Sequence, residues 1–202
     1  FVNGKQAGPE HKGGYTPFSF DITDLVNFDG DNVLSVRVDS SERQDIPPFG
    51  GVVDYLTFGG IYRDVHLRVV DRYFIEHVFA RPGDVLSERK KLDVTVHVDN
   101  ASDMGKTVNV KATLKDAKGA TVRSANTTVT LVPRGKSTCE LSMVSLTGIK
   151  VWDLDNPTLY TLKVQIEDDD AVSTRVGFRS AEFREDGAFS LNDQPMKLRG
   201  LN

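Results

Sequence analysis

Apolar and polar residues alternate along most of this chain. Residues 92–98 read Leu-Asp-Val-Thr-Val-His-Val, and the same pattern recurs at residues 34–38, 65–69, 108–114 and 160–166. Such alternation is typical of antiparallel strands that bury one face and expose the other. No long window carries a helical period; the best short candidate is one turn at residues 22–26, with Asp21 or Thr23 available as a cap. The sequence therefore predicts an all-β fold.

Turn-forming residues separate these runs. They stand at residues 29–32, 116–119, 133–135 and 192–193, where Asp, Asn, Gly and Pro cluster. Strands that recur every ~8–15 residues with such punctuation indicate β-sandwiches and not alternating strand–helix units.

The pattern of runs predicts a domain boundary near residue 72. Residues 73–178 hold about seven expected strands in about 100 residues, which is the size of an immunoglobulin-like sandwich. The Cys–Trp–Cys pattern of antibody domains is missing, so its core must rest on aliphatic packing. We expect Cys139 to be a buried apolar residue and Trp152 to anchor a loop against the sandwich.

The first 72 residues are too few for a complete sandwich. They contain about four expected strands and a long loop, residues 40–59, without a clear period. Loops of this length in a compact domain are usually functional or disordered. The aromatic residues Phe49, Tyr55 and Phe58 favour a functional loop.

Composition narrows the class of protein. The 202 residues are 39% hydrophobic and 27% charged, with 25 Lys and Arg against 29 Asp and Glu. These values are typical of a soluble globular protein and not of a disordered one. The net charge of −4 argues against a nucleic-acid-binding protein, and no apolar run approaches the length that spans a bilayer. The single cysteine excludes an internal disulfide. Because the chain opens at Phe1 without methionine, we expect it to be cut from a longer protein.

Three motifs, in order, resemble glycoside hydrolase family 2, the β-galactosidase and β-glucuronidase family. The first is VNGK at residues 2–5, followed by HKGGYTPF at 11–18 and FDITDL at 20–25. The second is GGIYRDV at residues 59–65. The third is FSLNDQP at residues 189–195, followed by LRGLN at 198–202. Each motif alone is weak, but their order around a sandwich of about 100 residues carries the resemblance.

The resemblance implies a domain order. Residues 1–72 would be the C-terminal part of a jelly-roll sugar-binding domain, residues 73–178 an immunoglobulin-like sandwich, and residues 179–202 the lead-in hairpin and first strand of a (β/α)₈ catalytic barrel. In that family two glutamates of the barrel form the catalytic pair of a retaining exo-glycosidase, ~5–5.5 Å apart. They would lie beyond residue 202, so we expect no catalytic residue in this chain and no activity from it alone.

The resemblance also implies three substrate-binding residues. An aspartate at the place of Asp54 reaches from the jelly roll toward the terminal sugar, where a carboxylate can accept two hydroxyl hydrogen bonds. Tyr55 beside it could face a sugar ring or pack the loop. Asn202 falls at the first barrel strand, whose C-terminal end borders the pocket. A solvent-exposed loop aspartate is the alternative interpretation of Asp54.

No cofactor is expected for this chain, although the family allows a sodium or magnesium ion in the intact parent. The four histidines show no zinc spacing. The acidic run at residues 167–170 reads as a solvated turn, with a calcium site as the alternative. Expected partners are a carbohydrate substrate of the parent and a further copy of the chain, with no nucleic acid and no membrane. The family suggests a bacterial cytoplasm or periplasm.

Two other functions stay open. The chain could be a non-catalytic carbohydrate-binding protein built of the same modules, or a structural module in which the sandwich is a spacer. Binding of sugars by the isolated chain would favour the carbohydrate-binding protein. Unchanged turnover of the parent after Asp54→Ala would favour the structural module.

Overall fold

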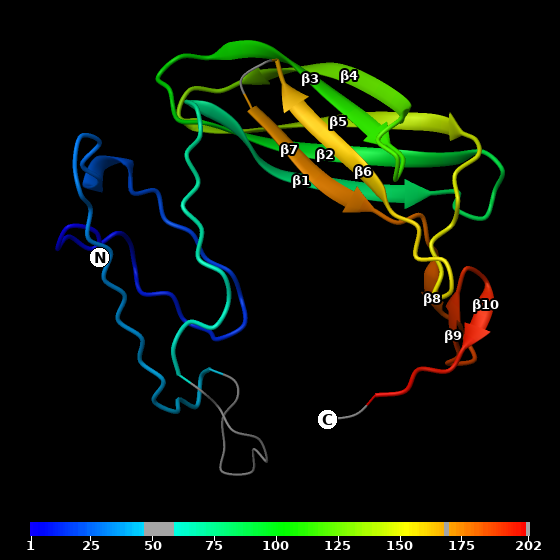
Figure 1. Cartoon of the computed structure of the whole chain (residues 1–202), viewed down its shortest axis with the longest axis horizontal. Helices are drawn as coiled ribbons and strands as arrows, with labels where there is room; N and C mark the ends of the chain where they lie inside the picture. Colours follow the sequence, from blue (N-terminus) through cyan, green and yellow to red (C-terminus); the bar gives the residue numbers. More distant parts are fainter. Residues whose placement is uncertain (47–58, 168–169, 201–202) are drawn as a thin grey trace. The chain divides into compact units, whose positions relative to one another are not determined.

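The computed structural model describes residues 1–46, 59–167 and 170–200. The chain divides into two compact units, residues 1–67 and residues 68–202, and each is described by itself (Figure 1). The described residues form three antiparallel sheets and contain no α-helix, as the alternation predicts. None of their helical segments is long and apolar enough to cross a membrane.

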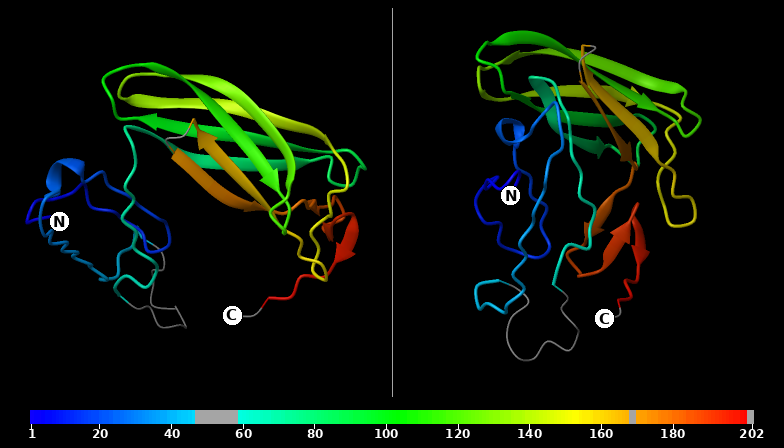
Figure 2. Two further views of the ribbon diagram at one scale, coloured as in Figure 1. Left: turned by 45° about the horizontal axis from the view of Figure 1, so that its top comes forward. Right: turned by 60° about the vertical axis from the view of Figure 1, so that its left-hand side comes forward.

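Two sheets make up most of the second unit. One has the strand order β1-β2-β5 and the other the order β4-β3-β6-β7. The two sheets lie in two layers (Figure 2). The strand bounds are β1 (Tyr73–Gly83), β2 (Lys90–Asn100), β3 (Lys106–Lys115), β4 (Thr121–Leu131), β5 (Gly135–Leu146), β6 (Tyr160–Ile166) and β7 (Asp170–Val176).

The hydrophobic core fills the space between these two sheets. Leu92, Val96 and Val98 of β2 are fully buried, as are Val164 and Ile166 of β6. Every second residue of β2 is buried along its whole length, which confirms the predicted alternation. Cys139 belongs to the same core, as predicted, and burial raises the pKa of its thiol.

The predicted turns join the strands. At residues 116–119 the Asp116 carboxylate accepts hydrogen bonds from the backbone N–H groups of Lys118 and Ala120, each at 2.9 Å. Gly119 has a φ of +83°, which glycine adopts without a steric penalty. The Asp116 side chain therefore closes the β3–β4 hairpin together with two backbone hydrogen bonds, from the Asp116 N–H to the Ala120 carbonyl and from the Gly119 N–H to the Asp116 carbonyl.

A third, small sheet follows the sandwich. Its order is β10-β9-β8, with β8 (Ala181–Phe183), β9 (Phe189–Leu191) and β10 (Gln194–Met196). Asn192 and Asp193 form the β9–β10 turn with φ values of +52° and +62°. These residues are among those that tolerate left-handed backbone best, so the turn predicted at 192–193 is confirmed.

The first unit contains no sheet among its described residues. The predicted strands at residues 34–38 and 65–69 are wrong in this respect: Val36 is 56% exposed and Leu67 74% exposed. Only isolated bridges join its segments, between Val2 and Lys5, Val2 and Leu34, and Arg43 and Ile46. Alternation gives a segment two faces, but a strand forms only where another strand supplies the hydrogen bonds.

One predicted helical turn lies in this unit. It is a 3₁₀ turn, η1 (Thr23–Leu25). The Asp21 carboxylate accepts hydrogen bonds from the Thr23 N–H at 2.9 Å and from the Thr23 hydroxyl at 2.6 Å. These two bonds lower the pKa of Asp21. The prediction of one short turn at residues 22–26 is therefore confirmed, but the predicted Asp21 or Thr23 cap is wrong, because Ile22 occupies the N-cap position and makes no side-chain capping bond.

Candidate functional site

The three predicted substrate-binding residues lie outside the described part of the chain. Asp54 and Tyr55 fall in residues 47–58, and Asn202 falls in residues 201–202. The structure therefore describes the two segments that flank the predicted loop and, separately, the end of the sandwich from which the C-terminal residues lead away.

The base of the long loop is closed. A Cβ added to Gly59 would meet the Ser40 Oγ at 2.5 Å and the Ser40 Cβ at 2.8 Å, closer than any real contact. The backbone at residue 59 thus lies directly against residue 40, and Gly60 next to it has a φ of +105°. The close approach is at Gly59 alone, since a Cβ on Gly60 would meet no atom within 4 Å, and it brings the two ends of the loop together.

The first stem of the loop carries a small ion-paired turn. The Arg43 guanidinium donates two hydrogen bonds to the Asp45 carboxylate, at 2.9 and 3.0 Å. The side-chain hydrogen bond from Arg43 lowers the pKa of Asp45, and the same bond raises the pKa of Arg43. Asp45 therefore already has a partner, so it is not an unpaired carboxylate that could take the substrate-binding role predicted for Asp54.

Aromatic side chains near the loop are exposed. Tyr62 is 66% exposed, and the Arg63 guanidinium lies 5.6 Å from its ring centroid. The rings of His11 and Phe18 stack with centroids 4.4 Å apart, and Phe18 in turn contacts Phe20. Phe18 is 55% exposed and Phe20 38% exposed, and sequence analysis did not single out the His11–Phe18 pair.

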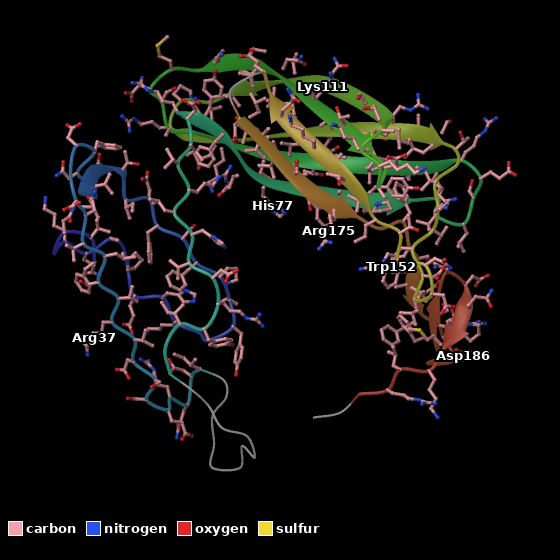
Figure 3. All side chains as sticks on the ribbon, in the orientation of Figure 1. Arg37, His77, Lys111, Trp152, Arg175 and Asp186 are labelled. Carbon is pink, nitrogen blue, oxygen red and sulfur yellow. The ribbon has the colours of Figure 1, made fainter. Side chains whose placement is uncertain are left out.

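Trp152 ties the end of the sandwich to the small sheet (Figure 3). Its backbone N–H donates to the Phe178 carbonyl, its carbonyl accepts from Asn192 Nδ2, and both distances are 2.9 Å. The Arg179 guanidinium lies 4.9 Å from the centroid of its indole ring. The predicted role of Trp152 as an anchor between a loop and the sandwich is confirmed, and a cation lies over its ring.

A shallow depression of about 530 Å³ lies beside this junction. The hairpin between β1 and β2 (residues 82–87), Arg89, Arg179 and Ser180 line it. The ammonium group of the buried Lys90 donates to the Ser87 carbonyl at 2.7 Å, which holds the hairpin in place. The lining is open and mixed in polarity, so its shape alone defines no ligand.

The acidic run at residues 167–170 is more structured than a solvated turn. It does join β6 to β7, but Glu167 forms an ion pair with Lys106 at 2.9 Å. The Asp170 carboxylate accepts the Ile75 N–H at 2.7 Å and lies 3.4 Å from an Arg68 nitrogen. The predicted turn is therefore present, but Glu167 and Asp170 each have a partner from another part of the chain. Among the described residues no group of three or more His, Cys, Asp and Glu could hold a metal ion.

The sandwich matches a known family. The family model described as Glycosyl hydrolases family 2 matches residues 73–179, more than half of the chain. The chain belongs to glycosyl hydrolase family 2. The resemblance that the three motifs predict is thereby confirmed.

Individual family 2 relatives match over the whole chain. A β-galactosidase of Thermoanaerobacterium thermosulfurigenes is 40% identical over 208 residues, which cover 100% of this chain and 28% of that protein. A β-galactosidase of Rhizobium meliloti is 37% identical over 94% of this chain and 24% of its own length. The crystal structure of a Bacteroides uniformis β-glucuronidase is 30% identical with a TM-score of 0.87, covering 100% of this chain and 25% of that one. This family 2 chain thus spans about a quarter of the length of the relatives it matches.

Proposed function

We propose that this chain is part of a β-galactosidase-like retaining exo-glycosidase that hydrolyses terminal β-linked sugars. The observation that carries the proposal is the 40% identity to a β-galactosidase along the entire chain. Relatives named β-glucuronidase match at lower identity, for example 30% for one of Bacteroides fragilis, so galactose is the favoured sugar. The catalytic glutamates would lie in the three quarters of such an enzyme that this chain does not span.

The three proposed domains fit the observed elements. Residues 73–178 would be an immunoglobulin-like sandwich, supported by seven strands in two facing sheets. Residues 1–72 would be the C-terminal part of a jelly roll. This is supported by extended segments whose apolar faces are exposed, which the remaining strands of a jelly roll would cover. Residues 179–202 would lead into the barrel, supported by the small sheet that begins at β8.

The contribution of this part would be to shape the rim of the sugar pocket. The two ends of the long loop meet at Ser40 and Gly59. Asp54 would accept hydrogen bonds from two sugar hydroxyls, with Tyr55 beside it and Asn202 at the first barrel strand. A carboxylate is suited to this task because its hydrogen bonds to hydroxyls are charge-assisted.

A substitution in the intact parent enzyme tests the role of Asp54. Asp54→Ala should lower kcat/KM on an aryl β-galactoside by about 10- to 150-fold, the equivalent of about 1.5–3 kcal/mol for a hydrogen bond to a charged group. Asp45→Ala is the matched control, because Asp45 is a carboxylate of the same loop whose partner is Arg43. Equal activity of Asp54→Ala and the parent would contradict the proposed role.

The isolated chain gives a second test. It should not hydrolyse the aryl β-galactoside, whereas the intact parent should. A parent without hydrolysis, combined with binding of galactose by the isolated chain in a calorimetric titration, would instead favour a non-catalytic carbohydrate-binding protein. A parent with neither property would favour a structural module.

A further inference from the structure

The two outer faces of the sandwich differ in charge. On the β4-β3-β6-β7 sheet, the neighbours Ala112, Leu114, Leu162 and Val164 are fully buried, so the residues between them point outward. Every charged side chain among the described outward-facing residues of this sheet in β3, β6 and β7 is a cation. They are Lys111, Lys115, Lys163 and Arg175.

Three of these cations form a diagonal row. Lys111 pairs with Gln165 across β3 and β6, so Lys163 is its diagonal neighbour. Lys163 pairs with Ser173 across β6 and β7, so Arg175 is the next diagonal neighbour. Each diagonal step spans ~7–8 Å. The row thus crosses three adjacent strands, with Lys111 on β3 and Arg175 on β7 marked in Figure 3.

No described carboxylate forms an ion pair with this row; the ion pairs of the described residues lie elsewhere. Two described acidic side chains of the adjoining turns already have partners. Asp116 accepts backbone N–H groups of its own turn, and Glu167 pairs with Lys106. Within the part of the chain that the structure describes, these three like charges therefore have no ion-paired carboxylate.

The opposite sheet provides an internal comparison. On β1-β2-β5 the outward cations are compensated: Lys91 lies 3.5 Å from Asp93, and Lys136 lies 3.9 Å from Asp99 and pairs with Glu76. Protein surfaces usually intersperse charges of both signs in this way. A face of one sign on a chain of net charge −4 is an attractive field for an anion.

The remaining side chains indicate the kind of anion. The row is surrounded by hydroxyl and amide groups, including Thr113, Thr161, Gln165 and Ser173, and the described outward residues of the sheet include no aromatic ring. Nucleic-acid bases and neutral sugars are commonly held by stacking on aromatic rings. Hydroxyls and amides instead bond sugar hydroxyls, while the cations bond carboxylate or sulfate groups.

We propose that this outer face, centred on Lys111, Lys163 and Arg175, binds an acidic polysaccharide with regularly spaced carboxylate or sulfate groups. The choice of a glycan among polyanions rests on the proposed glycosidase function. The face would hold the polymer from which the parent removes terminal sugars.

Binding by the 202-residue chain tests this proposal without any activity measurement. The chain is titrated at low ionic strength with polygalacturonate, dextran sulfate, neutral dextran and a double-stranded DNA oligonucleotide. The triple variant Lys111→Gln, Lys163→Gln, Arg175→Gln removes the row. The control variant Arg81→Gln, Lys91→Gln, Lys136→Gln removes two lysines and one arginine from the opposite sheet. Thermal unfolding of both variants reports whether they fold.

The expected result is binding of one or both acidic glycans and none of neutral dextran. The row variant should bind about tenfold more weakly, and the control variant within about twofold of the original chain. A preference for polygalacturonate or for dextran sulfate identifies carboxylate or sulfate as the recognised group.

The proposal is overturned if the chain binds no acidic glycan, if the two folded variants lose equal affinity for it, or if DNA binds more tightly than the glycans. If the row variant does not fold, Lys163→Gln alone must weaken binding for the proposal to stand. Because hydrolysis is not measured, these outcomes are independent of whether the parent is a galactosidase.

Discussion

Asp170 shows how one side chain fastens the start of the sandwich to its last strand. Its carboxylate, 17% exposed, accepts the Ile75 N–H of β1 and faces Arg68. Arg68 in turn donates to the Ile75 carbonyl at 2.8 Å and lies over the ring of Phe74. The N–H of Ile75 lies at the irregular point of the β1–β2 register, so a side chain satisfies it in place of the sheet.

Asp170→Ala should destabilise the second unit. Removing the carboxylate leaves the partly buried Ile75 N–H without its acceptor, at a cost of about 1–3 kcal/mol in the free energy of unfolding. Chemical denaturation monitored by the fluorescence of Trp152 measures the change. Asp155→Ala, in an exposed loop, is the control and should change stability by less than about 0.5 kcal/mol. Equal stability of both variants would show that the carboxylate does not hold Ile75.

A second residue-scale prediction concerns pH. Ser142 donates a 2.7 Å hydrogen bond to Asp93, and this bond, followed by the nearby Lys91, lowers the pKa of Asp93. Because the pKa is lower in the folded state, the stabilisation is present above about pH 4 and is lost as the pH falls below it. Ser142→Ala should raise the pKa of Asp93 toward its ordinary value in an NMR titration. Thr95→Ala is the control: an Asp93 pKa in this variant equal to that of the original chain would show that the effect comes from Ser142.

At the scale of elements, the turn between β9 and β10 links the small sheet to the end of the sandwich, although no backbone ladder connects this sheet to the two sandwich sheets. Asn192 accepts the Ser180 N–H at 3.0 Å with its side-chain oxygen and donates to the Trp152 carbonyl with its side-chain nitrogen. Its backbone N–H also donates to the Ser180 carbonyl. One left-handed turn residue therefore positions the whole small sheet against the end of the sandwich.

Asn192→Gly separates the two roles of this residue, which are its left-handed backbone conformation and its side-chain hydrogen bonds. Glycine keeps the φ of +52° but removes both side-chain bonds. Amides of β8 to β10 should then exchange with solvent about tenfold faster or more, while amides of β2 keep their protection. Asp193→Gly, at the other left-handed position of the turn, is the matched control and should leave exchange unchanged. Uniform loss of protection across both sheets would argue against a local tie.

At the scale of the whole chain, apolar surface is concentrated in the first unit. Leu34, Val36, Val65 and Leu67 are each more than half exposed, and they lie on segments without a paired strand. Contiguous apolar surface and open backbone edges are the features that promote association between chains. We therefore keep the expectation that the isolated chain associates with further copies of itself.

Light scattering tests this expectation. The 22.3 kDa chain should show an average mass above that of a monomer, rising with concentration. Val36→Lys together with Leu67→Lys should lower the average mass, because charges on these segments oppose pairing. Val144→Lys, at an exposed apolar position of β5, is the control and should not lower it. A monomer at high concentration would contradict association through the first unit.

The interior of the sandwich was predictable because its strands each bury one face and expose the other, which local alternation records. Alternation at residues 92–98 and 160–166 predicted which residues are buried, and the turn residues at 116–119 and 192–193 predicted where hairpins close. The same alternation at 34–38 gave a wrong expectation, since periodicity records two faces of a segment but not whether a partner strand is present.

By itself, the sequence determined the all-β class, the buried faces of β2, β3 and β6 and the family, because these depend on local periodicity and on short motifs. The tertiary structure alone decided the partners of Asp170, the contact of Gly59 with Ser40 and the diagonal of Lys111, Lys163 and Arg175. Each of these joins residues from different segments. Their proximity depends on strand register and loop closure, which pairing across the fold fixes and which no local pattern encodes.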